Sequence, residues 1–138
     1  MQQLSDYIYE LEFKVRDYEC DIQGIVNNAV YQNYLEHTRH EFLRSMDNDF
    51  AQMHAQGIDP VVIKSELEYK APLRSGDVFV VRLALHKQSF VKFQFMEDVY
   101  MKDTNKLVLK GIITCAVTIG GRPVKLDMLP EGIKRLMP

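Results

Sequence analysis

One segment of the chain follows the period of an α-helix, and nearly everything after it follows the period of β-strands. The core-facing positions of this segment recur every three or four residues: Tyr31, Tyr34, Leu35, Thr38, Phe42 and Met46. This spacing predicts a helix over about 28–46, with Asn27 and Asn28 as candidate N-caps. We expect a break near 47–49, a continuation to Gln56 and a stop at Gly57. A single long helix restricts the fold, because it cannot cover both faces of a sheet but can be wrapped by one.

The remaining segments alternate between apolar and polar residues, which is typical of strands. Alternation predicts strands over 7–16, 60–70, 78–87, 90–101 and 106–119, with turns at 71–77 and 102–105. A strand, one long helix and four strands in an antiparallel meander predict an α+β domain, with a five-stranded sheet wrapped around the helix. The first strand would join the sheet by a crossover, and a short helix is expected over 130–136.

Length and composition fit one ordinary globular domain spanning residues 1–138. The net charge of −2 and the absence of a basic stripe argue against nucleic acid, and no cationic amphipathic stretch indicates a membrane surface. No run approaches the roughly 20 apolar residues of a membrane span. Two cysteines without metal-ligand spacing predict a protein of the reducing cytoplasm that needs neither metal nor other cofactor.

The segment DYECDIQGIVNNAVYQNY, residues 17–34, is the most informative for function, because it joins a strand to the start of the helix. A helix N-terminus offers free backbone N–H groups that can bind a developing oxyanion. Gly24 permits close approach of a ligand, and the carboxylate of Asp21 precedes Asn28 by seven residues. A carboxylate and a donor around one carbonyl suit acyl transfer. From the residues alone, however, an Asp before a helix is more often a cap or turn residue.

This segment resembles the hot-dog-fold thioesterases of the 4-hydroxybenzoyl-CoA and acyl-CoA or acyl-ACP type. The matching residues of the motif are Val15, Asp21, Gly24, Ile25, Val26, Asn27, Asn28, Ala29 and Tyr31. The similarity continues through the helix, in Tyr34-Leu35-Glu36, Arg39 and Phe42-Leu43-Arg44, and through residues 68–77, EYKAPLRSGD. The order of strands also matches along essentially the whole chain.

The resemblance implies thioester hydrolysis with Asp21 as nucleophile or general base and the N–H near Asn28 polarising the carbonyl. It also implies an acyl-CoA or acyl carrier protein substrate, and a homodimer or homotetramer with its active site between subunits. The chain departs from many relatives because neither Ile25 nor Asn28 is a histidine. The Val-Asn-Asn-Ala form resembles the members that act on fatty acyl groups.

Other residues have both a functional and a structural interpretation. Tyr31 fits an acyl-pocket wall or the core, and Arg74, Lys87 and Lys92 fit contacts with CoA phosphates or solvated charges. Cys20 is expected to be an inert thiol, because it has no evident base. His37 and His40, three residues apart on the helix, are expected to be solvated rather than metal ligands.

Two other functions remain beside hydrolysis. One is a non-catalytic hot-dog module that binds acyl thioesters, which the missing histidines favour. The other is a dehydratase of the same fold, which the lack of a histidine between Asp21 and Asn28 disfavours.

Overall fold

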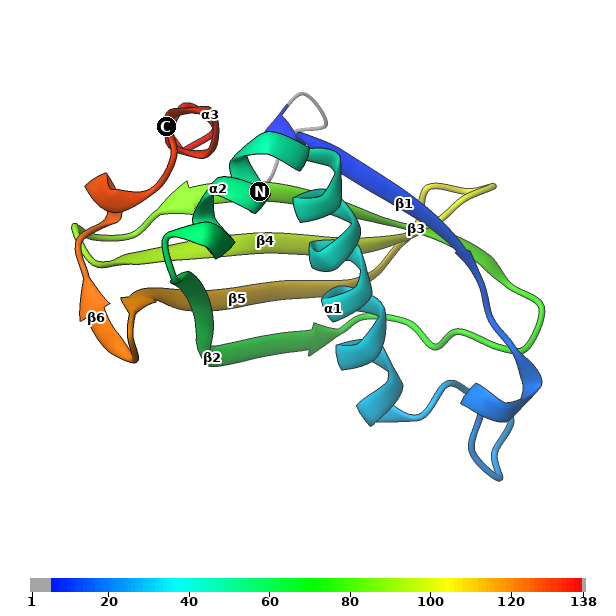
Figure 1. The fold of residues 1–138 in the computed structure, drawn as a ribbon. Helices are drawn as coiled ribbons and strands as arrows, with labels where there is room; N and C mark the ends of the chain where they lie inside the picture. The colour runs from blue at the N-terminus through cyan, green and yellow to red at the C-terminus, as the bar shows by residue number, and fades with distance from the viewer. Residues whose placement is uncertain (1–5, 138) are drawn as a thin grey trace.

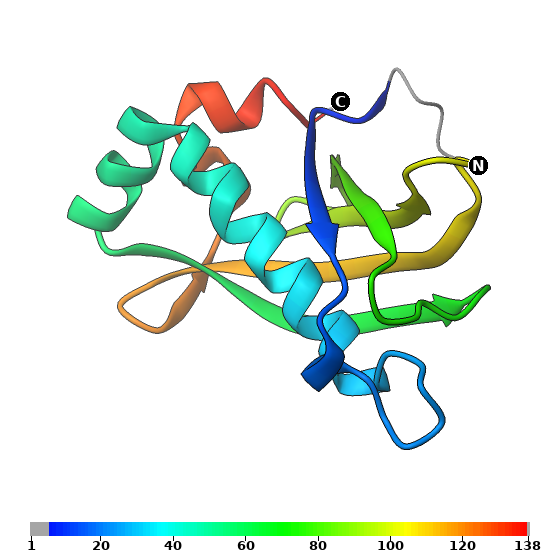
Figure 2. The same ribbon diagram turned by 90° about the vertical axis from the view of Figure 1, so that its right-hand side faces the viewer.

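In the computed structural model, which describes residues 6–137, a curved antiparallel sheet wraps around one long helix (Figure 1). The elements are β1 (Tyr9–Lys14), η2 (Asp17–Glu19), α1 (Asn28–Ser45), α2 (Asp47–Ala55), β2 (Ile58–Tyr69), β3 (Val78–Lys87), β4 (Lys92–Met101), β5 (Leu107–Ile119), β6 (Arg122–Val124), η3 (Leu126–Met128) and α3 (Glu131–Lys134). Figures 1 and 2 show α1 lying on one face of the sheet. The α+β architecture predicted from the sequence is therefore confirmed.

Helix α1 has the buried stripe that its sequence period predicts. Its buried residues are Tyr31, Tyr34, Leu35, Thr38, Arg39 and Phe42. The helix ends at Ser45, and Met46 leaves the helical conformation before α2 begins at Asp47. The predicted break thus falls one residue earlier than expected. No helix of the described residues is long and apolar enough to cross a membrane.

The sheet order is β1-β3-β4-β5-β2, which corrects the expected four-strand meander. Strands β3, β4 and β5 are consecutive neighbours, but β2 pairs with β5 at the far edge. The link from β2 to β3 is not a tight hairpin, because the two strands are not neighbours in the sheet. Leu73, in this link, is buried. There the Leu73 carbonyl accepts a hydrogen bond from Val26 N–H at 2.9 Å. A sixth short strand, β6, pairs with the end of β5 and was not predicted.

A buried hydrogen bond between Arg39 and Glu97 joins the middle of α1 to β4 on the concave face of the sheet. Arg39 Nη1 donates to Glu97 Oε1 at 2.8 Å, and Glu97 is 0% exposed. Glu97 Oε2 has no hydrogen-bond partner among the described residues. Gly111, opposite Glu97 on β5, gives α1 room, because a Cβ there would lie 3.1 Å from Leu35 Cδ1. Burial raises the pKa of Glu97 to about 8, although Arg39 acts to lower it.

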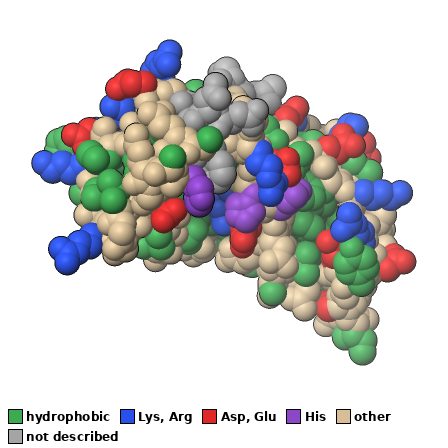
Figure 3. Space-filling model, viewed as in Figure 1, with side chains coloured by type: hydrophobic (Ala, Val, Ile, Leu, Met, Phe, Trp, Pro, Cys, Tyr) green, Lys and Arg blue, Asp and Glu red, His purple; other side chains and the backbone are tan. Residues whose placement is uncertain are grey.

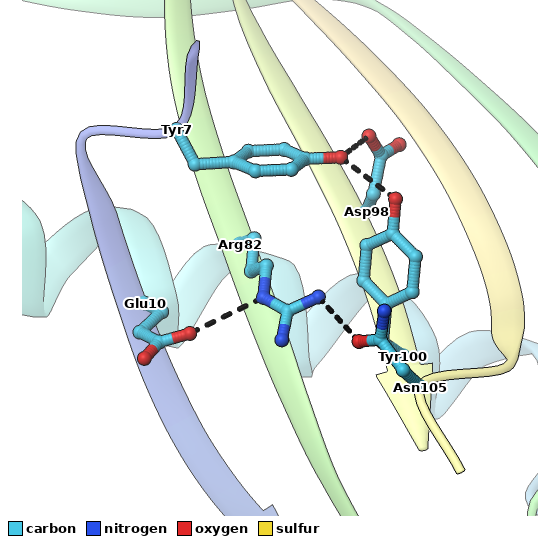
Figure 4. Close-up of polar contacts among 6 residues, drawn as sticks. All are labelled: Tyr7, Glu10, Arg82, Asp98, Tyr100 and Asn105. Atoms are coloured by element: carbon cyan, nitrogen blue, oxygen red, sulfur yellow. Dashed lines mark hydrogen bonds and ion pairs between the residues drawn. The ribbon is translucent and has the colours of Figure 1, made fainter. Parts of the chain in front are cut away.

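The next residue along β4, Asp98, belongs to a polar cluster on the opposite face of the sheet (Figure 4). Tyr7 Oη donates to Asp98 Oδ2 at 2.5 Å and lies 2.9 Å from Tyr100 Oη. Beside it, the guanidinium of Arg82 lies 4.6 Å from the Tyr100 ring centroid and bonds Asn105. Burial raises the pKa of Asp98 despite the bond from Tyr7. This cluster ties the segment before β1 to the sheet.

Candidate functional site

The loop that carries Asp21 is an ordered turn that closes on itself. Cys20 and Val26 form an isolated antiparallel bridge at its base. Inside the bridge, Asp21 N–H donates to the Ile25 carbonyl at 2.8 Å, and Gly24 N–H donates to the Asp21 carbonyl at 2.9 Å. Gly24 has φ of 81°, a conformation that favours glycine, and open space surrounds it. Glycine is therefore required here by the turn.

The side chain of Asp21 is exposed and helps to hold this turn. Its Oδ1 accepts hydrogen bonds from Gln23 N–H at 2.9 Å and from Ile25 N–H at 3.4 Å. This is the turn role that the residues alone favoured. Because the turn uses only Oδ1 and the group is exposed, solvent or a ligand can still reach the carboxylate.

The start of α1 separates the roles of the two neighbouring asparagines. Asn27 is the N-cap, and its Oδ1 accepts from Ala29 N–H at 3.0 Å while its carbonyl accepts from Val30 N–H at 2.9 Å. Asn28 is the first helical residue and is exposed. Among residues 6–137, the N–H of Asn28 donates to no protein acceptor. It remains available to a ligand at the positive end of the helix dipole.

Two further candidates lie at the same end of the molecule. Arg74 forms a backbone bridge with Ile25, and its side chain is exposed. Tyr31 is buried one turn into α1, where its hydroxyl accepts from Leu73 N–H at 3.3 Å. Burial raises the pKa of Tyr31, so its phenol stays neutral. The structure thus brings Asp21, Gly24, Asn28, Tyr31 and Arg74 to one end of the fold.

Lys87 lies elsewhere. It is the last residue of β3, whereas Val78, the first, pairs with Lys14 close to η2 and the Asp21 loop. In one chain the length of β3 therefore separates Lys87 from the other candidates (Figure 1).

A hollow of about 1040 Å³ lies between β1, η2 and the first half of α1. Phe13 forms part of its wall and stacks on Phe79, with ring centroids 5.1 Å apart. Tyr34 Oη donates to Glu19 Oε1 at 2.9 Å on the same wall, and burial together with Glu19 raises the pKa of Tyr34. Glu19, which the sequence analysis did not single out, also accepts a hydrogen bond from Arg16 N–H at 2.8 Å. Its position three residues after Arg16 was the available sequence signal.

The remaining candidates keep their structural interpretation. Cys20 is half-buried, and its Sγ donates a long, weak hydrogen bond to the Arg16 carbonyl at 3.9 Å. His37 and His40 are exposed, each near one glutamate at 3.9 and 3.8 Å. Among the side chains that the structure describes, no group of three His, Cys, Asp or Glu is arranged to hold a metal.

Comparisons with known proteins give consistent matches. Residues 15–135 match the family described as the thioesterase-like superfamily. A chloroplastic acyl-acyl carrier protein thioesterase of Arabidopsis thaliana is 39% identical over 106 residues, covering 75% of this chain and 56% of the relative. The long-chain acyl-CoA thioesterase FadM of Escherichia coli is 27% identical over 105 residues, covering 76% and 79%.

A solved structure agrees over nearly the whole chain. The crystal structure of a hypothetical protein from Aquifex aeolicus superposes with a TM-score of 0.79 at 32% identity. The match covers 94% of this chain and 99% of that one. The chain spans about half the length of the plant relatives that it matches.

Proposed function

The chain belongs to the thioesterase-like superfamily, and on this premise we propose that it hydrolyses an acyl thioester to a free acid and a thiol. The observation that carries the proposal is an exposed carboxylate, on the loop that leads into α1, together with a helix N–H that has no protein acceptor among residues 6–137. A thioester needs an attacking base or nucleophile and a stabilised oxyanion. Asp21 and Asn28 supply one of each.

Asn28 would polarise the thioester carbonyl. Its backbone N–H stands at the positive end of an 18-residue helix, where a developing negative charge is favoured. Its exposed side-chain amide can donate a second hydrogen bond. Because Asn27 satisfies Ala29 and Val30, the cap closes the helix start without occupying the Asn28 N–H. This arrangement supports an oxyanion role without an imidazole at position 25 or 28.

Asp21 would attack the carbonyl carbon or take a proton from an attacking water. In the first route the thiolate leaves, and water then cleaves the resulting anhydride. In the second, water adds directly and the thiolate is expelled from the tetrahedral intermediate. The two bonds that Oδ1 accepts fix the carboxylate over the turn, which limits its motion before reaction.

The substrate class follows from the relatives. One is named for acyl-acyl carrier protein and another for long-chain acyl-CoA. We propose a fatty acyl group carried by pantetheine, either in CoA or on a carrier protein. Exposed Arg74, tied by its backbone to the Asp21 loop at Ile25, is placed to meet a phosphate of the carrier. Buried Tyr31 would support the wall of the acyl site.

A second copy of the chain would pair along β2. Among residues 6–137 the outer edge of β2 pairs with no other strand, and Val61, Val62 and Ile63 on it are exposed. The other edge strand, β1, has 6 residues against 12 in β2 and alternates the charged residues Glu10, Glu12 and Lys14 along its length, whereas the charged residues of β2 lie outside the apolar run 61–63. Charged edges resist strand addition, whereas long edges with exposed apolar residues invite it. Light scattering during size-exclusion chromatography measures the resulting mass directly.

Release of free thiol from a panel of acyl-CoA and acyl carrier protein substrates tests the proposed function. Catalytic release above a protein-free control is expected for at least one fatty acyl length. Tight saturable binding without release on any substrate would instead establish the non-catalytic module. The non-catalytic module is the second candidate function. Two observations favour it: the missing histidines, and the hydrogen bonding of Asp21 Oδ1 within its own turn.

A further inference from the structure

Two exposed apolar segments that are distant in the sequence meet at the end of the molecule away from Asp21. Phe90, in the turn between β3 and β4, is 77% exposed, and Val91 beside it is exposed as well. Met128, in η3, is also exposed. The carbonyl of Phe90 accepts a hydrogen bond from Leu126 N–H at 2.8 Å, which fixes the two segments side by side.

The turn presents Phe90 on an ordered backbone. Ser89 Oγ accepts from Val91 N–H at 3.2 Å and from Lys92 N–H at 3.1 Å. Gln88 N–H donates to the Lys92 carbonyl at 3.0 Å and closes the hairpin. These bonds order the backbone at the end of the hairpin, so the exposed ring of Phe90 projects from an ordered turn.

Three lysines surround these apolar side chains. Lys87 Nζ lies 5.0 Å from the centroid of the Phe90 ring. Lys87 pairs directly with Phe93, so these two side chains lie on the same face of the hairpin. Lys92 is adjacent to Phe93 in the strand, so its side chain lies on the opposite face. Lys125 precedes Leu126 and is exposed. We name this set the tip patch: Lys87, Phe90, Val91, Lys92, Lys125 and Met128.

The charge of the tip patch is not neutralised by neighbouring carboxylates. Lys87, Lys92 and Lys125 form no ion pair within the described part of the chain. In the adjoining C-terminal segment, Glu131 is paired with Lys134 at 2.7 Å. Asp127, which is exposed, is the carboxylate nearest in sequence to Lys125. Figure 3 shows hydrophobic side chains and several Lys or Arg at this end of the molecule, with Asp or Glu side chains among them.

We propose that the tip patch docks the protein on an anionic lipid surface. Phe90, Val91 and Met128 would enter the boundary between headgroups and acyl chains, while the lysines reach up to the anionic headgroups. A protruding tip suits a deformable lipid surface, whereas a protein partner would need a pocket shaped for it. Such docking would bring the protein to a surface where amphipathic acyl compounds collect. No single stretch of the sequence is cationic and amphipathic, because two separate segments, 87–92 and 125–128, build the patch.

Co-sedimentation of the full chain with vesicles tests this proposal without any need for hydrolysis. We expect binding to vesicles of phosphatidylcholine with phosphatidylserine, weak binding to phosphatidylcholine alone, and release at high salt. Each lysine near such a surface contributes about fivefold in affinity. The variant Lys87→Gln, Lys92→Gln and Lys125→Gln should therefore bind about a hundredfold more weakly. The control is Lys14→Gln, Lys102→Gln and Lys106→Gln, which removes three exposed lysines at the opposite end, of which Lys102 pairs with Glu12, and should bind as wild type.

A second pair of variants tests the apolar contribution. Phe90→Ser should lower affinity for the anionic vesicles about tenfold, because one aromatic side chain no longer leaves water. Tyr18→Ser removes an equally exposed ring, at 76%, from the other end of the molecule and should change nothing. Equal losses in both members of either pair would overturn the proposal. So would binding of an acidic protein through the patch with no vesicle binding, since that would assign it to a protein partner.

Discussion

Asp21 and Glu97 are both carboxylates near α1, but their surroundings differ in every physical respect. Asp21 is exposed on a loop before the helix and accepts only backbone N–H groups of its own turn. Glu97 is fully buried beneath the middle of the helix and bonds the guanidinium of Arg39. Chemistry on a substrate needs an accessible group, whereas a buried charge constrains packing. Under the proposed function, the accessible group at the helix start would serve catalysis, whereas the buried pair holds the middle of the helix against the sheet.

The largest expected effect on folding comes from removal of Arg39. Arg39→Met leaves the Glu97 carboxylate buried without its cation, so above pH 8 we expect a loss of about 3–5 kcal/mol in the free energy of unfolding. The double variant Arg39→Met with Glu97→Met should recover most of the loss, because two apolar side chains need no pairing. Urea denaturation measures both. Similar stability of the single variant and wild type would show that the pair does not constrain α1.

The pH dependence of stability tests the same side chain. The folded protein holds the proton of Glu97 up to a pKa of about 8, whereas the unfolded chain releases it near 4.5. Between these values the folded state binds more protons, so the free energy of unfolding should fall as pH rises from 5 to 8. Glu97→Gln should flatten this decline. If wild type and variant show parallel curves, Glu97 is ionised throughout and the assigned direction is wrong.

A smaller effect distinguishes the two candidate phosphate contacts. Arg74→Gln should raise KM about threefold to tenfold through loss of one exposed charged contact, with kcat little changed. Lys87→Gln should change KM less, because Lys87 lies at the other end of β3. Steady-state kinetics at low and moderate salt measure both. Equal effects would indicate that Lys87 reaches the site from a second subunit.

Local sequence patterns predicted the helix, but they did not predict which residues distant in the sequence contact one another. The period of α1 predicted its buried stripe. Arg39 also lies on that stripe, but its charge gave no indication that it is buried. Alternation through Phe93, Phe95 and Val99 puts Glu97 on the inner face, yet nothing in the strand reveals a partner 58 positions earlier. The pairing of β2 with β5 was missed for the same reason. Which strands become neighbours in a sheet depends on contacts between segments that are distant in the sequence.

The candidate site was predicted in part for a similar reason. The loop and the helix start are local in sequence, so Asp21, Gly24 and Asn28 were found together. The division of labour between Asn27 and Asn28 required backbone geometry, because both are good caps by type. Lys87 was grouped with Arg74 on charge alone, and only the strand direction separates them.

The central claim is that Asp21 performs the chemistry without contributing to packing. Thiol release by Asp21→Asn tests it most directly, because the amide oxygen can keep the turn bonds while the carboxylate is lost. We expect kcat to fall by at least about a hundredfold, with an unchanged unfolding midpoint and oligomeric mass. Turnover near the wild-type rate by this variant would contradict the account.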